Sequence, residues 1–211
     1  IYSNLLLYEQ ITFAISNLLF SVTIVMILGF VRVYTKGITD TNYIRPAFAY
    51  VLVIATLFGA YRIPYQSIVE AVGHFKQTRN GAFFEAALNI VVSVIFVNKL
   101  GLVGVAIGTL CATVFRTFQY CIYMSNHIIE RSLVPLIKRL FLSAITICCI
   151  VILSKKFNFC NASSYYEWVI QAIPITLLAI LVVFVVEFIF YRTELRLTFT
   201  KLKHALFKRK K

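Results

Sequence analysis

Six long apolar segments dominate this sequence, and each is close in length to a helix that crosses a bilayer. A hydrocarbon core of roughly 30 Å needs about 20 apolar residues in a helix. The segments run approximately over residues 10–31, 47–70, 80–97, 102–124, 135–153 and 168–191. A spanning helix satisfies its backbone hydrogen bonds internally. We therefore predict an all-α integral membrane protein with a bundle of six transmembrane helices.

The segment at 135–153 is the weakest of the six. Its uncharged run, residues 140–153, is short, so it needs flanking Lys and Arg side chains that extend to the membrane surface.

The amino-acid composition excludes an ordinary soluble domain. Apolar residues make up 60% of the chain and charged residues 14%, against about 45 to 50% and about 25% in soluble domains.

The net charge of +13 does not indicate a nucleic-acid partner, because the basic residues lie between the apolar segments and at the C-terminus. Thirteen Lys and Arg residues fall on one side of the predicted membrane and six on the other, and eight of the thirteen lie in the tail at 192–211. Basic residues favour the cytoplasmic side. We expect a lobe over residues 1–191 and a basic amphipathic tail over 192–211 that lies in the cytoplasm, on the inner leaflet.

No catalytic, cofactor or metal-binding pattern stands out. The five cysteines have no paired spacing, and His74, His127 and His204 lie outside acidic clusters. The chain starts at Ile1 and has no leader pattern, so it is expected to be a fragment of a longer protein.

Four charged residues interrupt the apolar segments: Arg62, Glu85, Arg116 and Glu187. A charge at the bilayer centre costs roughly 2.5 to 3.5 kcal/mol on insertion scales, so such residues usually face a protein interior or an aqueous cavity. With the tail in the cytoplasm, all four fall in the cytoplasmic half. Glu85 is expected only five residues from the inner end of its segment.

Polar residues recur at helical spacing around these charges, which places them on one face of each segment. The three faces include Arg62 with Gln66, Glu85 with Asn89, and Thr113 with Arg116. One interpretation is that they line a common cavity. The alternative is that the charges are struts between helices, with Arg62 paired to Glu85 or Glu70, and Arg116 to Glu187.

Several stretches resemble the polysaccharide flippases, which move capsule or O-antigen repeat units. They are YTKGITD at 34–40, YRIPY at 61–65, EAVGHFKQTR at 70–79, EAALNI at 85–90 and GLVGVAIGTL at 101–110. The resemblance covers roughly residues 30–140. It implies an exporter of the multidrug, oligosaccharidyl-lipid and polysaccharide superfamily, in which two six-helix lobes enclose a central cavity. This chain would be the C-terminal lobe, and the N-terminal lobe would be a missing partner.

The same resemblance implies a substrate and a place. The substrate would be an undecaprenyl-pyrophosphate-linked oligosaccharide, moved across the bacterial cytoplasmic membrane by alternating access. Membrane lipids surround such a protein, and protons or sodium would drive the movement. The residues expected to bind the substrate and line the cavity are Arg62, Gln66, Lys76, Arg79, Glu85, Asn89, Thr113 and Arg116. The arginines would bind the pyrophosphate, because guanidinium groups match phosphate geometry.

Three other functions stay open at this point. A multidrug or organic-cation antiporter of the same superfamily would need acidic residues in its cavity, whereas the deep charges here include two arginines. A membrane-embedded enzyme of polysaccharide assembly would need paired carboxylates or a partnered histidine. A third alternative is that the isolated chain has no activity and only packs against its missing half.

Overall fold

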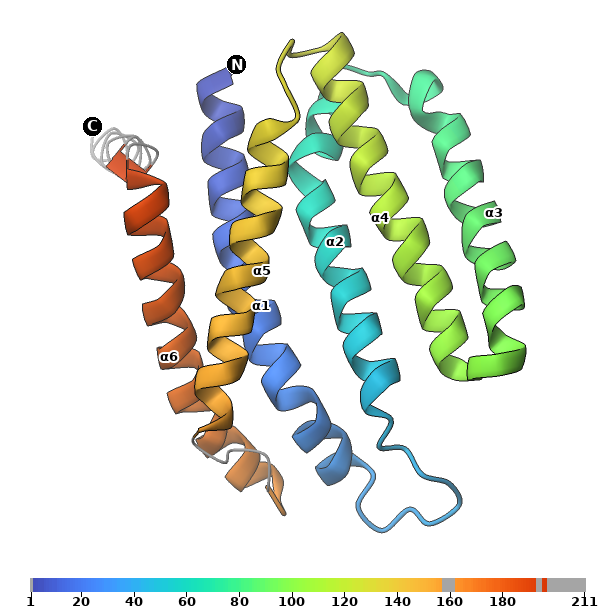
Figure 1. Ribbon diagram of the computed structural model, residues 1–211, viewed down its shortest axis with the longest axis vertical. Helices are drawn as coiled ribbons and strands as arrows, with labels where there is room; N and C mark the ends of the chain where they lie inside the picture. The colour runs from blue at the N-terminus through green and yellow to red at the C-terminus, as the bar shows by residue number, and fades with distance from the viewer. Residues whose placement is uncertain (1, 157–161, 193–194, 197–211) are drawn as a thin grey trace, which may run out of the picture.

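The computed structural model describes residues 2–156, 162–192 and 195–196, and within them the fold is entirely helical (Figure 1). The helices are α1 (Tyr2–Tyr34), α2 (Pro46–Ala71), α3 (Phe75–Leu100), α4 (Leu102–His127), α5 (Val134–Lys155) and α6 (Tyr165–Phe190). All six are long and apolar enough to cross a membrane. The prediction of a multi-pass, all-α membrane protein is confirmed, and α5 meets the same criteria as the other five.

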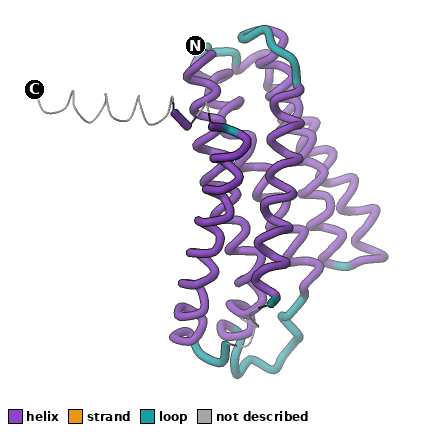
Figure 2. The backbone as a smooth tube through the Cα atoms, turned by 60° about the vertical axis from the view of Figure 1, so that its left-hand side comes forward, coloured by secondary structure: helices purple, strands orange, loops and turns teal. Residues whose placement is uncertain are grey.

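The helices run side by side along one axis, and the connections lie at two ends of the molecule (Figures 1 and 2). The upper end in Figure 1 holds the start of α1, the α2–α3 and α4–α5 connections and the end of α6. The lower end holds the α1–α2, α3–α4 and α5–α6 connections. Successive helices therefore alternate in direction, as the six predicted spans require.

Local residues explain where α2 and α6 begin and how α3 turns into α4. Pro46 begins α2, a position where its missing N–H costs nothing. The Ser164 side chain accepts a hydrogen bond from the Glu167 backbone N–H and so caps α6. Gly101 alone joins α3 to α4 and adopts φ +56°, a conformation that L side chains rarely take. The α3–α4 pair is therefore a tight helical hairpin.

Two helices begin earlier than the sequence indicated. The first begins at Tyr2 instead of about residue 10, because the charge of Glu9 is paired inside the protein. The third begins at Phe75 instead of about residue 80, because the polar residues Lys76 and Arg79 lie exposed on its first turns. This extension places Glu85 ten residues from the helix start instead of five, so Glu85 lies further along its helix than the sequence indicated.

The packing order explains which surfaces stay open. From one edge to the other, α3 packs on α4, α4 on α2, α2 on α1, and α1 on α5 and α6. The main core lies among α1, α2, α4 and α5, and it contains Leu5, Phe13, Leu57, Tyr61, Tyr65, Val69, Tyr120, Cys121, Met124 and Leu136. In α3 only Thr78 and Gly81 are buried. Thus α3 is an edge helix.

Gly104 and Gly108 bring α3 and α4 into close contact, as the G-x-x-x-G spacing indicates. A Cβ added at Gly104 would overlap the Phe96 backbone, and one at Gly108 would lie 2.8 Å from the Asn89 carbonyl oxygen.

The predicted tail at 192–211 lies outside the described residues except for 192 and 195–196.

Candidate functional site

A charged cluster joins the three helices α2, α3 and α4 near their middle. The Glu85 carboxylate accepts a hydrogen bond from Arg62, with Oε1 and Nη1 3.0 Å apart. Its other oxygen, Oε2, lies 3.4 Å from Nε of Arg116. One carboxylate thus bridges two guanidinium groups. The cluster carries a surplus of one positive charge.

The three residues lie at similar depth. Arg62, Glu85 and Arg116 lie nine, ten and eleven residues from the upper ends of their helices. At a rise of 1.5 Å per residue, this corresponds to about 14 to 17 Å. The cluster is therefore in the upper half of the bundle but close to its centre, where an unpaired charge is costly.

Arg116 is held by several contacts besides Glu85. Its Nη1 donates to the Thr78 carbonyl oxygen at 2.9 Å and to Gln119 Oε1 at 2.6 Å. Its Nη2 donates to the Tyr120 hydroxyl at 3.0 Å, and the guanidinium carbon lies 4.4 Å from the centre of that ring. The side chain is only 7% exposed. Arg116 is thus fixed in place and positions Glu85.

Gly81 makes this arrangement possible. A Cβ added at Gly81 would overlap both the Gln119 amide and the Arg116 guanidinium. The glycine leaves a recess in α3 that these two side chains of α4 occupy. Sequence reasoning did not identify Gly81, because an isolated glycine in an apolar segment has many explanations.

Arg62 is the more accessible of the two arginines. Its side chain is 23% exposed, against 7% for Arg116. The Arg62 Nε is itself buried and has no hydrogen-bond partner among the described residues. Glu85 is 27% exposed. An anion that approached this face of the bundle would meet Arg62 before Arg116.

The remaining predicted site residues are not drawn into the cluster. Gln66 donates to Glu70 at 2.7 Å, and Thr113 donates to the Thr109 carbonyl at 2.7 Å, both within one helix. Asn89 accepts from Ser93 at 3.1 Å at the α3–α4 contact. Lys76 and Arg79 are exposed near the upper end of α3.

The polar faces of α3 and α4 pack directly on each other around Gly108. Those two faces are therefore joined, and not separated by a cavity.

The salt bridges predicted for the two arginines have different outcomes. The pairing of Arg62 with Glu85 is present. The pairing of Arg116 with Glu187 is wrong, because the Arg116 side chain reaches Glu85 on the neighbouring helix α3. Glu187 instead accepts a hydrogen bond from Gln10 of α1 at 3.1 Å.

A second ionic cluster, which the sequence analysis missed, surrounds Glu9. Arg131, from the α4–α5 connection, forms two hydrogen bonds with the Glu9 carboxylate, one of them from Nη1 at 3.1 Å. Arg139 of α5 lies 3.6 Å from the same carboxylate. Glu9 is fully buried. Burial alone would lower the pKa of Arg131, but the hydrogen bonds and charge of Glu9 outweigh it and raise the pKa.

The signal for this cluster was present in the sequence. Glu9 and Gln10 precede Phe13, Ser16 and Asn17 at spacings of three and four residues, which indicates one helix face. The expected start of the first segment at residue 10 excluded Glu9 from that face.

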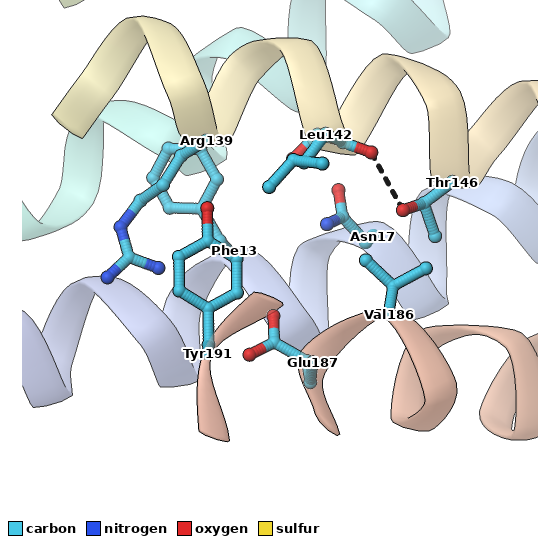
Figure 3. Close-up of a pocket in the computed structure, with 9 residues that line it drawn as sticks. Phe13, Asn17, Arg139, Leu142, Thr146, Val186, Glu187 and Tyr191 are labelled. Atoms are coloured by element: carbon cyan, nitrogen blue, oxygen red, sulfur yellow. Dashed lines mark hydrogen bonds between the residues drawn. The ribbon is translucent and has the colours of Figure 1, made fainter. Parts of the chain in front are cut away.

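The interior between α1, α5 and α6 is polar beside this cluster (Figure 3). A cavity of about 10 Å³ there is lined by residues that include Asn17, Arg139 and Glu187. This is about the space of one water molecule. Thr146 donates to the Leu142 carbonyl at 2.7 Å (Figure 3). The space is too small for a sugar or a phosphate.

Comparison with known proteins adds no assignment: no protein-family model, no curated protein and no solved structure matches this chain.

Proposed function

We propose that this chain is one lobe of a transporter that moves an undecaprenyl-pyrophosphate-linked oligosaccharide across the bacterial cytoplasmic membrane. The observation that carries the proposal is the cationic cluster of Arg62, Glu85 and Arg116 near the middle of three candidate spans. The resemblance of residues 30–140 to polysaccharide flippases supports the same function.

The surplus positive charge of this cluster suits an anionic ligand. A charge held deep in a bilayer is unfavourable without a counter-charge, and a pyrophosphate would supply one. Arg62 is the direct contact in this proposal, because its side chain is 23% exposed whereas that of Arg116 is only 7% exposed. Arg116 is a positioning residue for Glu85.

The exposed cations at the upper end of α3 have a separate role. Lys76 and Arg79 lie about one turn apart on the first turns of that helix. In the proposed orientation the upper end faces the cytoplasm, where the lipid-linked substrate is loaded. These residues would attract its pyrophosphate before it reaches Arg62, since charged surfaces raise the local concentration of counter-ions.

A second lobe completes the proposed cavity. In the described chain α3 is an edge helix with little burial, and its Glu85 and the neighbouring Arg62 of α2 remain partly exposed. A facing six-helix lobe would enclose this side, and rocking of the two lobes would alternate access. No covalent bond changes in such a cycle, so the proposed protein is not an enzyme.

The test is an export assay in the complete transporter. Arg62→Ala should lower export by about tenfold to a hundredfold, because a charge-assisted hydrogen bond contributes about 1.5 to 3 kcal/mol. Arg62→Lys should restore only part of it, because lysine lacks the bidentate geometry. Arg116→Ala and Arg116→Lys should also lower export, since both disturb Glu85. Lys99→Ala, at the lower end, is the control.

Two outcomes would overturn the proposal. One is undiminished export in all four arginine variants at normal protein levels. The other is export of lipophilic cations without any accumulation of lipid-linked sugar intermediate when the transporter is deleted, which would assign the chain to the cation antiporters instead.

A further inference from the structure

An apolar cleft opens at the lower end of the molecule, between the last turns of α1 and the first turns of α2. Its volume is about 470 Å³, within the range of ligand pockets. Ile27, Leu28 and Val31 line it from α1, and Phe48 and Leu52 line it from α2. The α1–α2 connection closes one side. The cleft is distant from the Arg62–Glu85–Arg116 cluster, which lies in the upper half of the bundle.

The cleft is apolar at one end and polar at the other. Its apolar walls belong to two candidate membrane spans. The polar part of its lining, which we call its mouth, consists of Tyr34, Tyr43 and Arg45 at or beyond the ends of those spans, together with Thr35. Tyrosines at the ends of spans lie at the level of lipid headgroups. The gradient from alkyl walls to a cationic mouth matches a molecule with a hydrocarbon chain and an anionic head.

Arg45 is positioned to bind that head. Its side chain is exposed, and its Nε donates to the Asn42 carbonyl oxygen at 3.3 Å, which orients the guanidinium group. Within the described residues no Asp or Glu forms a salt bridge with Arg45. The nearby Asp40 carboxylate accepts a hydrogen bond from the Tyr43 hydroxyl at 3.0 Å. The terminal nitrogens of Arg45 therefore remain available for a phosphate.

We propose that this cleft binds one glycerophospholipid, with an acyl chain between α1 and α2 and its phosphate on Arg45. The site goes beyond the proposed transport function and does not depend on it. The bound lipid comes from the leaflet at the lower end, opposite the leaflet next to residue 2 and the end of α6. An anionic headgroup is favoured over a zwitterionic one, because the mouth has a cation without a carboxylate partner.

The test uses the full chain, extracted in mild detergent, stripped of lipid and then mixed with phosphatidylglycerol or phosphatidylcholine. Native mass spectrometry counts the lipids that remain bound. The wild-type chain should retain one phosphatidylglycerol and retain less phosphatidylcholine. Leu52→Trp, which fills the cleft, should lower retention at least fivefold. Arg45→Ala should remove the preference for phosphatidylglycerol.

Two control variants separate the cleft from general effects. Leu177→Trp adds the same bulk to an exposed position of α6, and Lys99→Ala removes a cation at the same end of the molecule; both should retain lipid as the wild type does. Helix content by circular dichroism checks that each variant is folded. Equal retention in Leu52→Trp and Leu177→Trp would overturn the proposal.

Further additions distinguish the chemistry of the occupant. Excess inorganic phosphate should not displace the lipid, because it lacks the acyl chain; displacement would show that only the headgroup is bound. Undecaprenyl phosphate should compete poorly with phosphatidylglycerol. Preferential retention of undecaprenyl phosphate would overturn the glycerophospholipid assignment without bearing on the arginines of the transport site.

Discussion

At the residue scale, the position of Arg116 depends on a neighbour that has no side chain. Gly81 leaves the recess that the Arg116 guanidinium and the Gln119 amide occupy. Gly81→Ala should displace both groups and release Glu85, so export by the complete transporter should fall by about tenfold while the protein level is kept. The comparison is Gly59→Ala on α2, where an added Cβ meets nothing within 4 Å. Equal export by both variants would show that Arg116 is not held as described.

Glu9 tests a different property, the stability of the bundle. Replacing it by glutamine removes the carboxylate that pairs with the buried Arg131 side chain and that lies 3.6 Å from Arg139. Removing one member of a buried ion pair costs about 3 to 5 kcal/mol. Glu9→Gln should therefore lower the unfolding temperature in detergent markedly. Glu70→Gln, at an exposed residue that accepts a hydrogen bond from Gln66, should change it little. Similar midpoints for the two variants would contradict a stabilising role for Glu9.

Individual residues were predictable only where a charge interrupts an apolar segment. Arg62, Glu85 and Arg116 stand out for that reason, and the structure brings all three together. Glu9 was missed because it lies near the end of its segment, where charges are ordinary. Gln66 and Thr113 have the right spacing for a shared face, yet each hydrogen bonds within its own helix. Spacing gives the face of a helix, but not what lies opposite it.

At the element scale, the α3–α4 hairpin shows which contacts the chain can encode locally. Gly101 makes the turn, and Gly104 and Gly108 allow the two backbones to approach. A side chain at position 104 or 108 would push the two helices apart. Because the hairpin has a single-residue connection, its pairing follows from nearby residues.

Gly108→Leu should therefore weaken this hairpin. The added side chain would begin 2.8 Å from the Asn89 carbonyl oxygen, and backbone atoms of α3 can move away only if the helices separate. We expect a lower unfolding temperature in detergent and less protein in the membrane. Gly59→Leu on α2 places the same side chain in open space and should be tolerated. Unchanged stability of Gly108→Leu would contradict close α3–α4 packing.

At the scale of the whole molecule, the order of helices differs from their order in the chain. The chain passes from α2 through the α3–α4 hairpin and then from α4 to α5, which packs on α1. Arg131 lies in the α4–α5 connection, where the chain passes from the α3–α4 hairpin to α5, and it donates a hydrogen bond to Glu9 of α1. This contact joins the part of the bundle that holds the proposed transport site to the part formed by α1, α5 and α6.

The alternating directions of the helices predict a labelling pattern in cells. With its native cysteines replaced, the chain carrying Asp40→Cys or Lys99→Cys should react with a membrane-impermeant maleimide added outside. Val72→Cys and Ser132→Cys, at the upper end, should react only after the membrane is permeabilised. The reverse pattern would overturn the proposed cytoplasmic location of the C-terminus. Reaction of all four from one side would contradict six spans.

Hydropathy along the chain is enough to predict six membrane-spanning helices, because a helix satisfies its own backbone hydrogen bonds and needs only about 20 apolar residues to cross. It also singles out four charges within the apolar segments, Arg62, Glu85, Arg116 and Glu187. The partners of those charges, the burial of Glu9 and the role of Gly81 follow from the packing of the helices in the folded chain. These features depend on which helices become neighbours. Helix neighbours are set by packing between residues far apart in the chain, and the hydropathy of each segment carries no information about that packing.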